Sequence, residues 1–228
     1  NQFDNKTSNT PDDLYNKIKI DEATKNLKKI QKFLINAMEA TKRAIGIGKF
    51  MLTYLGQVDT NLQDIDLCEL ISNNLTKFKS ELPENMVLNC SFKTSDAKIS
   101  GNPNQITEIT SNLINNASES MKNIQKMNIN LSIFITNSLN IITSNIFPKD
   151  FKPKDREFAC LEVKDNGEGI TKENIEKIFD PFFSTTFTGR GLGLPVVLGA
   201  VRAHRGCITV NSEINSGSTF RLYFPIIN

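Results

Sequence analysis

Two glycine-rich stretches hold the residues of this chain that are best suited to chemistry. Asp165-Asn-Gly-Glu-Gly-Ile170 places a carboxylate ahead of alternating glycines, and Gly189-Arg-Gly-Leu-Gly-Leu194 repeats the glycine pattern before an apolar segment. A carboxylate on a tight turn can accept hydrogen bonds from a ligand, and glycines let backbone N–H groups approach phosphates at a helix N-terminus. Together the two stretches predict a nucleotide pocket, and we expect the nucleotide to be ATP.

The first stretch has a specific expected position and also an ordinary explanation. Asp165 ends a run of alternating apolar residues, so its carboxylate should lie at a sheet edge or in a half-closed pocket. There it can accept a hydrogen bond from the exocyclic amine of adenine. Gly167 and Gly169 allow positive φ angles and the close approach of a base. Taken alone, Asp165-Asn-Gly would be an ordinary Asx-Gly turn.

The second stretch is expected to bind phosphate through backbone N–H groups that form an anion nest at the start of a helix. The residues of this nest are Gly189, Gly191, Leu192, Gly193 and Leu194. Arg190 offers a cation for the phosphates, although a solvated arginine is an equally good explanation.

A third candidate element is a helix that carries Asn112 and Asn116 one turn apart, and therefore on one face. Neutral amide oxygens suit a hydrated Mg²⁺ ion that bridges phosphates. The alternative is a pair of exposed asparagines on an asparagine-rich chain. The aromatic segment Phe179-Asp-Pro-Phe-Phe183 would, by itself, indicate core packing.

A long helix, 14–57, is predicted to precede these elements, because its apolar residues recur at intervals of three, four and seven. Such a stripe predicts a helical hairpin or a dimer. Gly46 and Gly48 could mark a bend. We expect residues 1–60 to form this helical dimerisation segment and residues 61–228 to form an ATP-binding domain.

The remaining pattern alternates strands with helices, which predicts a mixed sheet covered by helices on one face. The expected helices are 67–79, 104–122, 172–179 and 194–204. The expected strands are 86–92, 98–101, 128–136, 158–164, 207–212 and 219–225.

Composition excludes several classes of protein. The net charge of +2 argues neither for nor against nucleic acid, because the lysines are spread along the chain and form no cluster, and we expect no nucleic-acid partner. No apolar run is long enough to span a bilayer and no signal peptide opens the chain, so this part should be cytoplasmic and make no membrane contact. The four cysteines form no CxxC pair, which predicts buried reduced thiols. Because the chain begins with Asn1, we expect it to be a fragment of a longer protein.

Four motifs together resemble a known family. Asn112…Asn116-Ala117, Asp165-x-Gly167-x-Gly169, Phe179-x-Pro-Phe-Phe183 and Gly189-x-Gly-Leu-Gly-Leu194 occur in the order of the N, G1, F and G2 boxes of sensor histidine kinases. The resemblance covers roughly residues 80–228 and includes the closing Gly217-Ser-Thr-Phe220. Lys49-Phe-Met-Leu-Thr-Tyr-Leu-Gly-Gln57 resembles the second dimerisation helix of hybrid-type kinases.

The resemblance implies a two-layer α/β sandwich with a mixed sheet, the Bergerat-type ATP-binding fold, preceded by a long dimerisation helix. By the same resemblance, Asp165 would bind the adenine amine, Asn116 would reach Mg²⁺ and Asn112 would lie beside the phosphates. The glycines of the second stretch would cradle the phosphates, and Thr219 would help to fix adenine. The interval between Phe183 and Gly189 is short for the lid of this family.

The family resemblance implies a function and partners. It implies a kinase core that transfers the γ-phosphate of ATP to a histidine, for relay to an aspartate in the receiver domain of a response regulator. It also implies a homodimer through the N-terminal helix. Gyrase-like, chaperone and mismatch-repair ATPases share the pocket, but many place a glutamate one turn before the metal-binding asparagine. Here that position is Asn112, and an amide cannot act as a general base, so phosphotransfer is favoured over hydrolysis.

The phosphate acceptor is not evident in the chain. Neutral histidine is a competent nucleophile near neutral pH, but His204 follows a helix where the family often has a structural histidine. Asn1-Gln-Phe-Asp-Asn5 echoes the family's acceptor box with asparagine in the place of histidine. Three interpretations remain open: a kinase core whose acceptor is lost or supplied elsewhere, an ATP-binding pseudokinase scaffold, and a serine kinase of the anti-sigma-factor type, which the long helix disfavours.

Overall fold

The computed structural model describes residues 11–54, 61–94, 96–121, 127–137, 145–153, 157–185 and 191–227. The chain divides into two compact units, Asn1–Gly48 and Lys49–Asn228. The domain boundary expected near residue 60 stays a prediction, because residues 55–60 lie outside the described part. Asn1–Asn5, which echo the acceptor box, also lie outside it.

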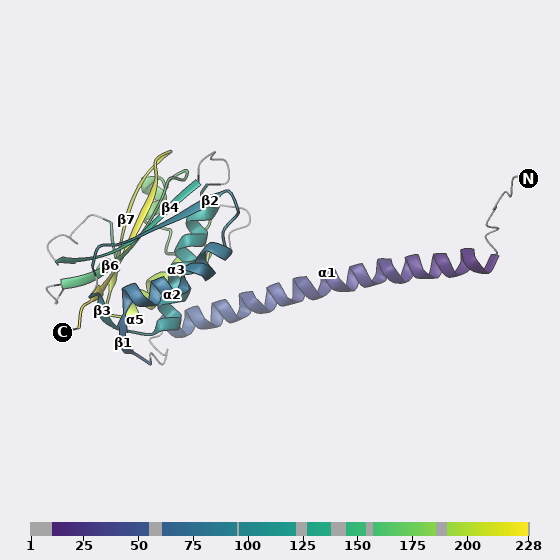
Figure 1. The fold of residues 1–228 in the computed structure, drawn as a ribbon, viewed down its shortest axis with the longest axis horizontal. Coiled ribbons are helices and arrows are strands. Elements are labelled where there is room, and N and C mark those ends of the chain that lie inside the picture. The colour runs from purple at the N-terminus through teal and green to yellow at the C-terminus, as the bar shows by residue number, and fades with distance from the viewer. Residues whose placement is uncertain are drawn as a thin grey trace, which may run out of the picture. The chain divides into compact units, whose positions relative to one another are not determined.

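The long helix α1 (Pro11–Tyr54) makes up the described part of the first unit and ends six residues beyond the boundary at Gly48; it confirms the expected N-terminal helix (Figure 1). Gly46 and Gly48 lie inside this helix and do not end it. Its apolar side chains are strongly exposed, from 51% at Ile35 to 77% at Phe33. A helix with this much exposed apolar surface gains most of its stability from a packing partner.

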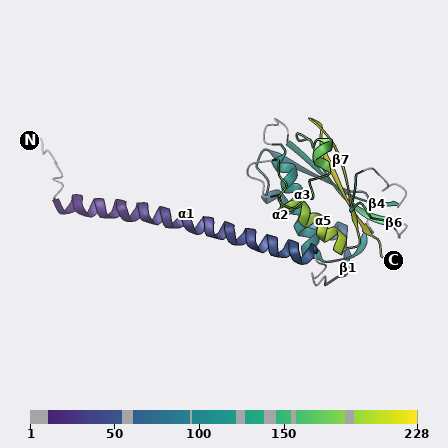
Figure 2. The ribbon, with the colours of Figure 1, turned by 180° about the vertical axis from the view of Figure 1, so that it is seen from behind.

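The second unit is a six-stranded mixed sheet with helices on one face, as the sequence predicted (Figure 1, Figure 2). The strand order is β2-β4-β6-β8-β7-β5; β2 and β4 are parallel and the other neighbours are antiparallel. The strands are β2 Met86–Phe92, β4 Met127–Asn137, β5 Ile146–Phe147, β6 Glu157–Asp165, β7 Cys207–Glu213 and β8 Gly217–Pro225. The helices are α2 Leu67–Ser80, α3 Pro103–Glu119, α4 Lys172–Ile175 and α5 Gly193–Ala203.

Three details differ from the sequence-based expectation. The strand Lys98–Gly101 (β3) does not join the main sheet but pairs with β1 (Gln63–Asp66), a strand that was not predicted. The excursion between β4 and β6 contains the short strand β5, which pairs with β7. The helix expected over 172–179 is only the single turn of α4, followed by turns up to Asp180.

The core lies between the sheet and the helices. Alternate residues of the central strands, such as Leu161, Val163 and Leu222, face this layer and are fully buried. Leu113 of α3 and Val201 of α5 meet them from the helical layer. Each such side chain stabilises the fold by about 1.5–3 kcal/mol relative to leaving it exposed. The core therefore holds α3 and α5 on one face of the sheet, which is what positions the predicted site residues.

The cysteines were predicted to be reduced and buried; all are free thiols, but not all are buried. All four are free: Cys160 and Cys207 are buried in a small apolar cluster on the other face of the sheet, whereas Cys90 on the edge strand β2 is exposed. Burial raises the pKa of the Cys207 thiol to about 12. The expectation that the thiols are buried is thus wrong for Cys90. Within the described residues, no helix combines the length and apolar content that crossing a bilayer requires.

The histidine joins two helices of the second unit. His204 is 3% exposed and caps the C-terminal end of α5. Its Nδ1–H donates to the carbonyl of Ala200 at 2.7 Å, and its Nε2 accepts from the backbone N–H of Asn102, the N-cap of α3, at 2.9 Å. The ring of Phe224 lies edge-on to the imidazole. Both ring nitrogens are therefore used to hold the start of α3 against the end of α5.

This arrangement predicts a pH-dependent stability. Burial lowers the pKa of His204 below its ordinary value of 6.5, and the hydrogen bond to Ala200 opposes this. The folded state therefore binds the proton less readily than the unfolded chain. The contribution of the neutral ring is complete above about pH 6.5 and is lost as the pH falls from there through the lower folded pKa, at a rate of at most about 1.4 kcal/mol per pH unit.

Thermal unfolding between about pH 8 and pH 5 measures this loss, since Tm should decline below about pH 6.5. His204→Leu should lower Tm at high pH, because the Asn102 N–H loses its partner, and should make the decline below that pH shallower. Equal slopes in the two proteins would assign the pH dependence to other groups.

Candidate nucleotide-binding site

A cavity of about 650 Å³ lies between α3, α5 and the turn that follows β6. Most of the predicted site residues in the described part of the chain line it. They are Asn112, Asn116, Asp165, Gly169, Gly191, Leu192, Gly193 and Leu194. Gly189 and Arg190, which were expected to bind phosphate, lie outside the described residues.

Asp165 was expected either at a sheet edge or in a half-closed pocket. It ends β6, which lies inside the sheet between β4 and β8, and its side chain lines the cavity. Its Oδ1 accepts three hydrogen bonds: from Gly167 N at 2.8 Å, from Ser218 N at 3.2 Å and from the Ser120 hydroxyl at 3.3 Å. Among the described residues, every hydrogen bond that another residue donates to this carboxylate ends on Oδ1. Oδ2 is therefore the oxygen available to a ligand.

The electrostatics of Asp165 follow from its burial. The side chain is buried, which raises the pKa of the carboxyl above the usual range, and the hydrogen bonds from Gly167, Ser218 and Ser120 oppose that rise. A carboxylate held this way remains an acceptor at neutral pH. It can receive an N–H donor such as an exocyclic amine, at a site where water competes weakly.

Two glycines of the turn after Asp165 have no room for a side chain. A Cβ at Gly167 would lie 2.0 Å from the Ser120 hydroxyl and 2.8 Å from Asp165 Oδ1. Gly169 has a φ of +74°, and a Cβ there would lie 2.1 Å from the carbonyl oxygen of Glu213. Gly167 does not itself line the cavity; it lets Ser120 and the backbone reach the carboxylate.

The opposite end of the cavity offers donors without protein partners. The side-chain nitrogen of Asn116 is buried and makes no hydrogen bond in the described part of the chain. An ideal Cβ on Gly193 would lie 3.8 Å from Asn116 Oδ1, so this glycine leaves open space beside the asparagine. An unpaired buried amide is costly, and a ligand that pairs with it removes that cost.

The N-terminus of α5 has no side-chain cap among the described residues. Side chains of Asp66, Asn102 and Thr171 cap the helices α2, α3 and α4, but Leu192, the N-cap of α5, makes no side-chain capping hydrogen bond. The first N–H groups of an uncapped helix and its dipole together favour an anion. The predicted phosphate-binding glycines Gly191 and Gly193 lie at this helix start.

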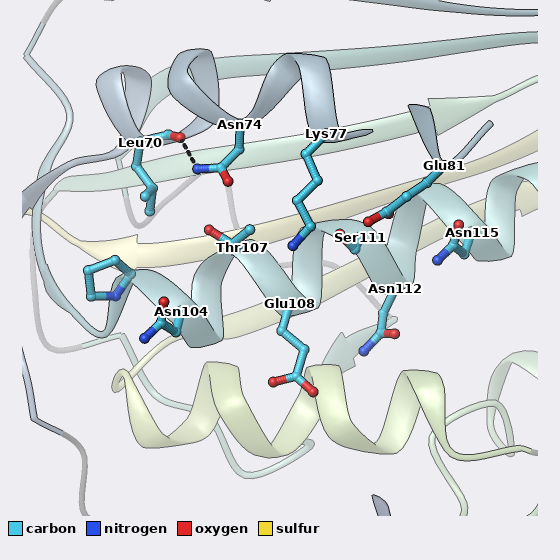
Figure 3. Close-up of a pocket in the computed structure, with 11 residues that line it drawn as sticks. Leu70, Asn74, Lys77, Glu81, Asn104, Thr107, Glu108, Ser111, Asn112 and Asn115 are labelled. Atoms are coloured by element: carbon cyan, nitrogen blue, oxygen red, sulfur yellow. Dashed lines mark hydrogen bonds between the residues drawn. The ribbon is translucent and has the colours of Figure 1, made fainter. Parts of the chain in front are cut away.

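Asn112 lies where the cavity meets a second, more open cavity of about 520 Å³ between α2 and α3. Figure 3 shows that Asn112 and Glu108 extend from α3 on the side of α5, whereas Lys77 extends from α2 toward α3. The two predicted asparagines are thus on the same side of α3, one turn apart. The position one turn before Asn116 is therefore occupied by an amide, and not by the glutamate expected of a hydrolysing ATPase.

The aromatic segment separates into three environments. Phe179 is buried against Phe147, with ring centroids 4.6 Å apart, and belongs to the core. Phe183 is half-buried and lines the cavity, whereas Phe182 is 65% exposed. The Phe182 N–H donates to the carbonyl of Gly191 at 2.8 Å. Residues 186–190 of the lid lie outside the described part.

Thr219 does not reach the cavity, contrary to the expectation drawn from the family resemblance. It pairs with Lys164 of β6, whereas its neighbours Ser218 and Phe220 line the cavity. Side chains alternate along a strand, so Thr219 faces the other side of the sheet. The residues that sequence reasoning missed are Ser218 and Ser120, both of which bind Asp165. The alternation along 217–225 was the signal that could have identified Ser218.

The chain belongs to the family of histidine kinase-, DNA gyrase B- and HSP90-like ATPases, which matches residues 101–228. Within that family it is a catalytic domain of the histidine kinase type, which confirms the resemblance inferred from the sequence motifs.

Its relatives include sensor kinases of bacteria. Sporulation kinase C of Bacillus subtilis is 30% identical over 62% of this chain, and sensor histidine kinase ZraS of Escherichia coli is 30% identical over 72% of it. The chain spans only 28% and 31% of the lengths of these two proteins. The solved histidine kinase ThkA, in complex with the response regulator protein TrrA, has the same fold, with a TM-score of 0.58, 21% identity and coverage of 83% of this chain and 49% of ThkA.

Gly167→Ala and Gly193→Ala form a matched pair that tests the packing of the site. The Cβ at position 167 would clash with Ser120 and Asp165, so we expect the free energy of unfolding to fall by about 1–3 kcal/mol. The Cβ at position 193 meets its neighbours at ordinary contact distance, so the change should stay within about 0.5 kcal/mol. Urea unfolding measures both. Equal values would show that the turn after Asp165 adjusts freely.

Proposed function

We propose that this chain is the kinase core of a cytoplasmic two-component sensor histidine kinase and binds ATP with Mg²⁺. The observation that carries the proposal is the division of the cavity into two chemically different ends. One end presents the oriented carboxylate of Asp165, which suits the amine of adenine. The other presents the uncapped start of α5 and the unpartnered amide of Asn116, which suit phosphates.

Each residue then has a defined task. Asp165 accepts from the adenine amine through Oδ2 while Oδ1 stays bound to the protein. The backbone N–H groups of Gly193 and Leu194 donate to phosphate oxygens at the start of α5. Asn112 lies beside the phosphates, and Phe183 covers part of the cavity.

The side-chain amide of Asn116 would hold the Mg²⁺ ion that accompanies ATP. Its Oδ1 lies beside the open space at Gly193 and is the atom that could face the ion, whereas its Nδ2, which has no partner among the described residues, would donate to a phosphate oxygen. Oxygen ligands and retained waters are what Mg²⁺ prefers. When bound, the ion would neutralise charge on the phosphates, and the protein would hold them against the helix N-terminus.

Phosphoryl transfer is favoured over hydrolysis because position 112, one turn before Asn116, carries an amide and not a carboxylate. The amide of Asn112 cannot remove a proton from water. His204 cannot serve as acceptor either, since its ring is buried and both nitrogens are hydrogen-bonded within the fold. We therefore propose that the acceptor histidine is supplied from outside this chain, by the parent protein or by a partner.

The proposed partners are a response regulator receiver domain and a second copy of this chain. The complex of ThkA with TrrA supports the first. The exposed apolar side chains of α1, such as Leu27, Leu34 and Met38, support the second, because a stripe at helical spacing needs a packing partner. Sedimentation velocity distinguishes a monomer from a dimer.

Asp165→Asn tests the adenine end of the site. The amide still offers an oxygen to Gly167, Ser218 and Ser120 but presents no charged acceptor to the ligand. We expect ATP affinity to fall by about tenfold or more, the size of a hydrogen bond to a charged group. Stability at neutral pH should hold or rise, because the raised pKa of Asp165 means that the ionised form costs folding energy above that pKa.

Isothermal titration with ATP and urea unfolding separate these two effects. Asp96→Asn, which changes a carboxylate on the surface, is the matched control and should leave both values unchanged. Unchanged ATP affinity in Asp165→Asn would remove Asp165 from the site.

A phosphotransfer assay separates the kinase from a pseudokinase scaffold. The chain is incubated with radiolabelled ATP, Mg²⁺ and a dimerisation domain that carries an acceptor histidine. We expect label on that domain and none on this chain, because His204 is inaccessible. ATP binding without any transfer would instead support the scaffold. Label on His204 would contradict the assignment of that residue.

A further inference from the structure

The turn between β7 and β8 closes over the turn that carries Asp165. Asn215 N donates to the carbonyl of Glu168 at 2.8 Å, and Ile170 N donates to the hydroxyl of Ser212 at 2.8 Å. Glu168 and Ile170 both line the cavity. The last turn of the sheet therefore sets the position of the adenine-end wall of the cavity.

The hydroxyl of Ser212 makes several of the hydrogen bonds at these two turns. It pairs with Ser218 across β7 and β8, and its hydroxyl lies 2.9 Å from the Ser218 hydroxyl and 3.0 Å from the carbonyl oxygen of Gly217. With the N–H of Ile170, three groups meet one hydroxyl. A serine hydroxyl can donate once and accept twice, so all three contacts can be satisfied at the same time.

Because a hydroxyl has only one proton to donate, the three partners of Ser212 determine the direction of each hydrogen bond. A carbonyl only accepts, so Ser212 gives its one proton to Gly217. It then accepts from Ile170 and has to accept from Ser218 as well. The Ser218 proton is thereby turned toward Ser212 and away from the cavity. What Ser218 offers to the cavity, which it lines, is an acceptor oxygen.

We propose that Ser212 is a positioning residue that makes the base end of the pocket select adenine over guanine, by holding the Ser218 hydroxyl as an acceptor. Asp165 Oδ2 and Ser218 Oγ then present acceptors only. Both atoms can accept from the exocyclic amine of adenine, whereas the O6 carbonyl of guanine, which only accepts, gains no hydrogen bond from either of them. This inference depends on the proposed ATP site.

The consequence for a variant is specific. In Ser212→Ala the Ile170 N–H loses its partner and the Ser218 proton is free to turn into the cavity, where it can donate to O6 of guanine. We expect ATP affinity to fall about five- to tenfold, the equivalent of one hydrogen bond, while GTP affinity falls less or rises. Ser212→Thr keeps the hydroxyl and should restore the ratio of the two affinities.

The experiment is a titration of the full chain with ATP and with GTP, alongside thermal unfolding of each variant. Ser218→Ala is the second variant: it removes the acceptor itself and should also reduce the preference for ATP. Ser132→Ala is the matched control, because this hydroxyl binds Glu162 on the same sheet away from the cavity. It should leave the ratio of the two dissociation constants unchanged.

The outcomes are distinguishable. If the parent chain does not bind ATP, the proposed function fails, irrespective of Ser212. If the parent binds ATP but Ser212→Ala and Ser218→Ala keep its ratio of GTP to ATP dissociation constants, the specificity assignment is overturned. An equal loss of both affinities together with a lower Tm would show that Ser212 acts only on stability.

Discussion

The hydrogen bonds to Oδ1 of Asp165 are the interaction on which the second unit depends. The three donors come from the end of α3, the turn after β6 and the start of β8. A buried carboxylate is tolerated only when donors surround it, and here its pKa is raised by burial despite them. The position of this one oxygen therefore ties the helical layer to the sheet. It also explains why Gly167 leaves no room for a side chain.

The two ends of the cavity differ in how completely their polar groups are satisfied. Around Oδ1 of Asp165 and the hydroxyl of Ser212 the described donors and acceptors form a closed set, which leaves Oδ2 of Asp165 for a ligand. Around Asn116 and the start of α5 they do not. A closed set defines the shape and chemistry of the base-binding end before any ligand arrives. Open groups cost stability, and a phosphate that pairs with them recovers it on binding.

The sequence predicted elements with strong periodicity and missed those whose formation depends on tertiary contacts. The bounds of β2 and β3 agree with the expectation because alternation over 86–92 and 98–101 is clear. Which sheet β3 joins was not readable, since β1 has only four residues and no apolar run of its own. The two-residue strand β5 exists because β7 provides a partner. Sequence motifs identified the glycines and Asp165, but a serine that binds a buried carboxylate has no local signature.

The single histidine of the chain, His204, has a structural role in the fold. The one imidazole present bridges α3 and α5, and these are the two helices that carry Asn116 and the predicted phosphate-binding N-terminus. A ring used in this way has no free nitrogen and cannot approach a γ-phosphate. Transfer to a histidine then requires a group outside this packed layer.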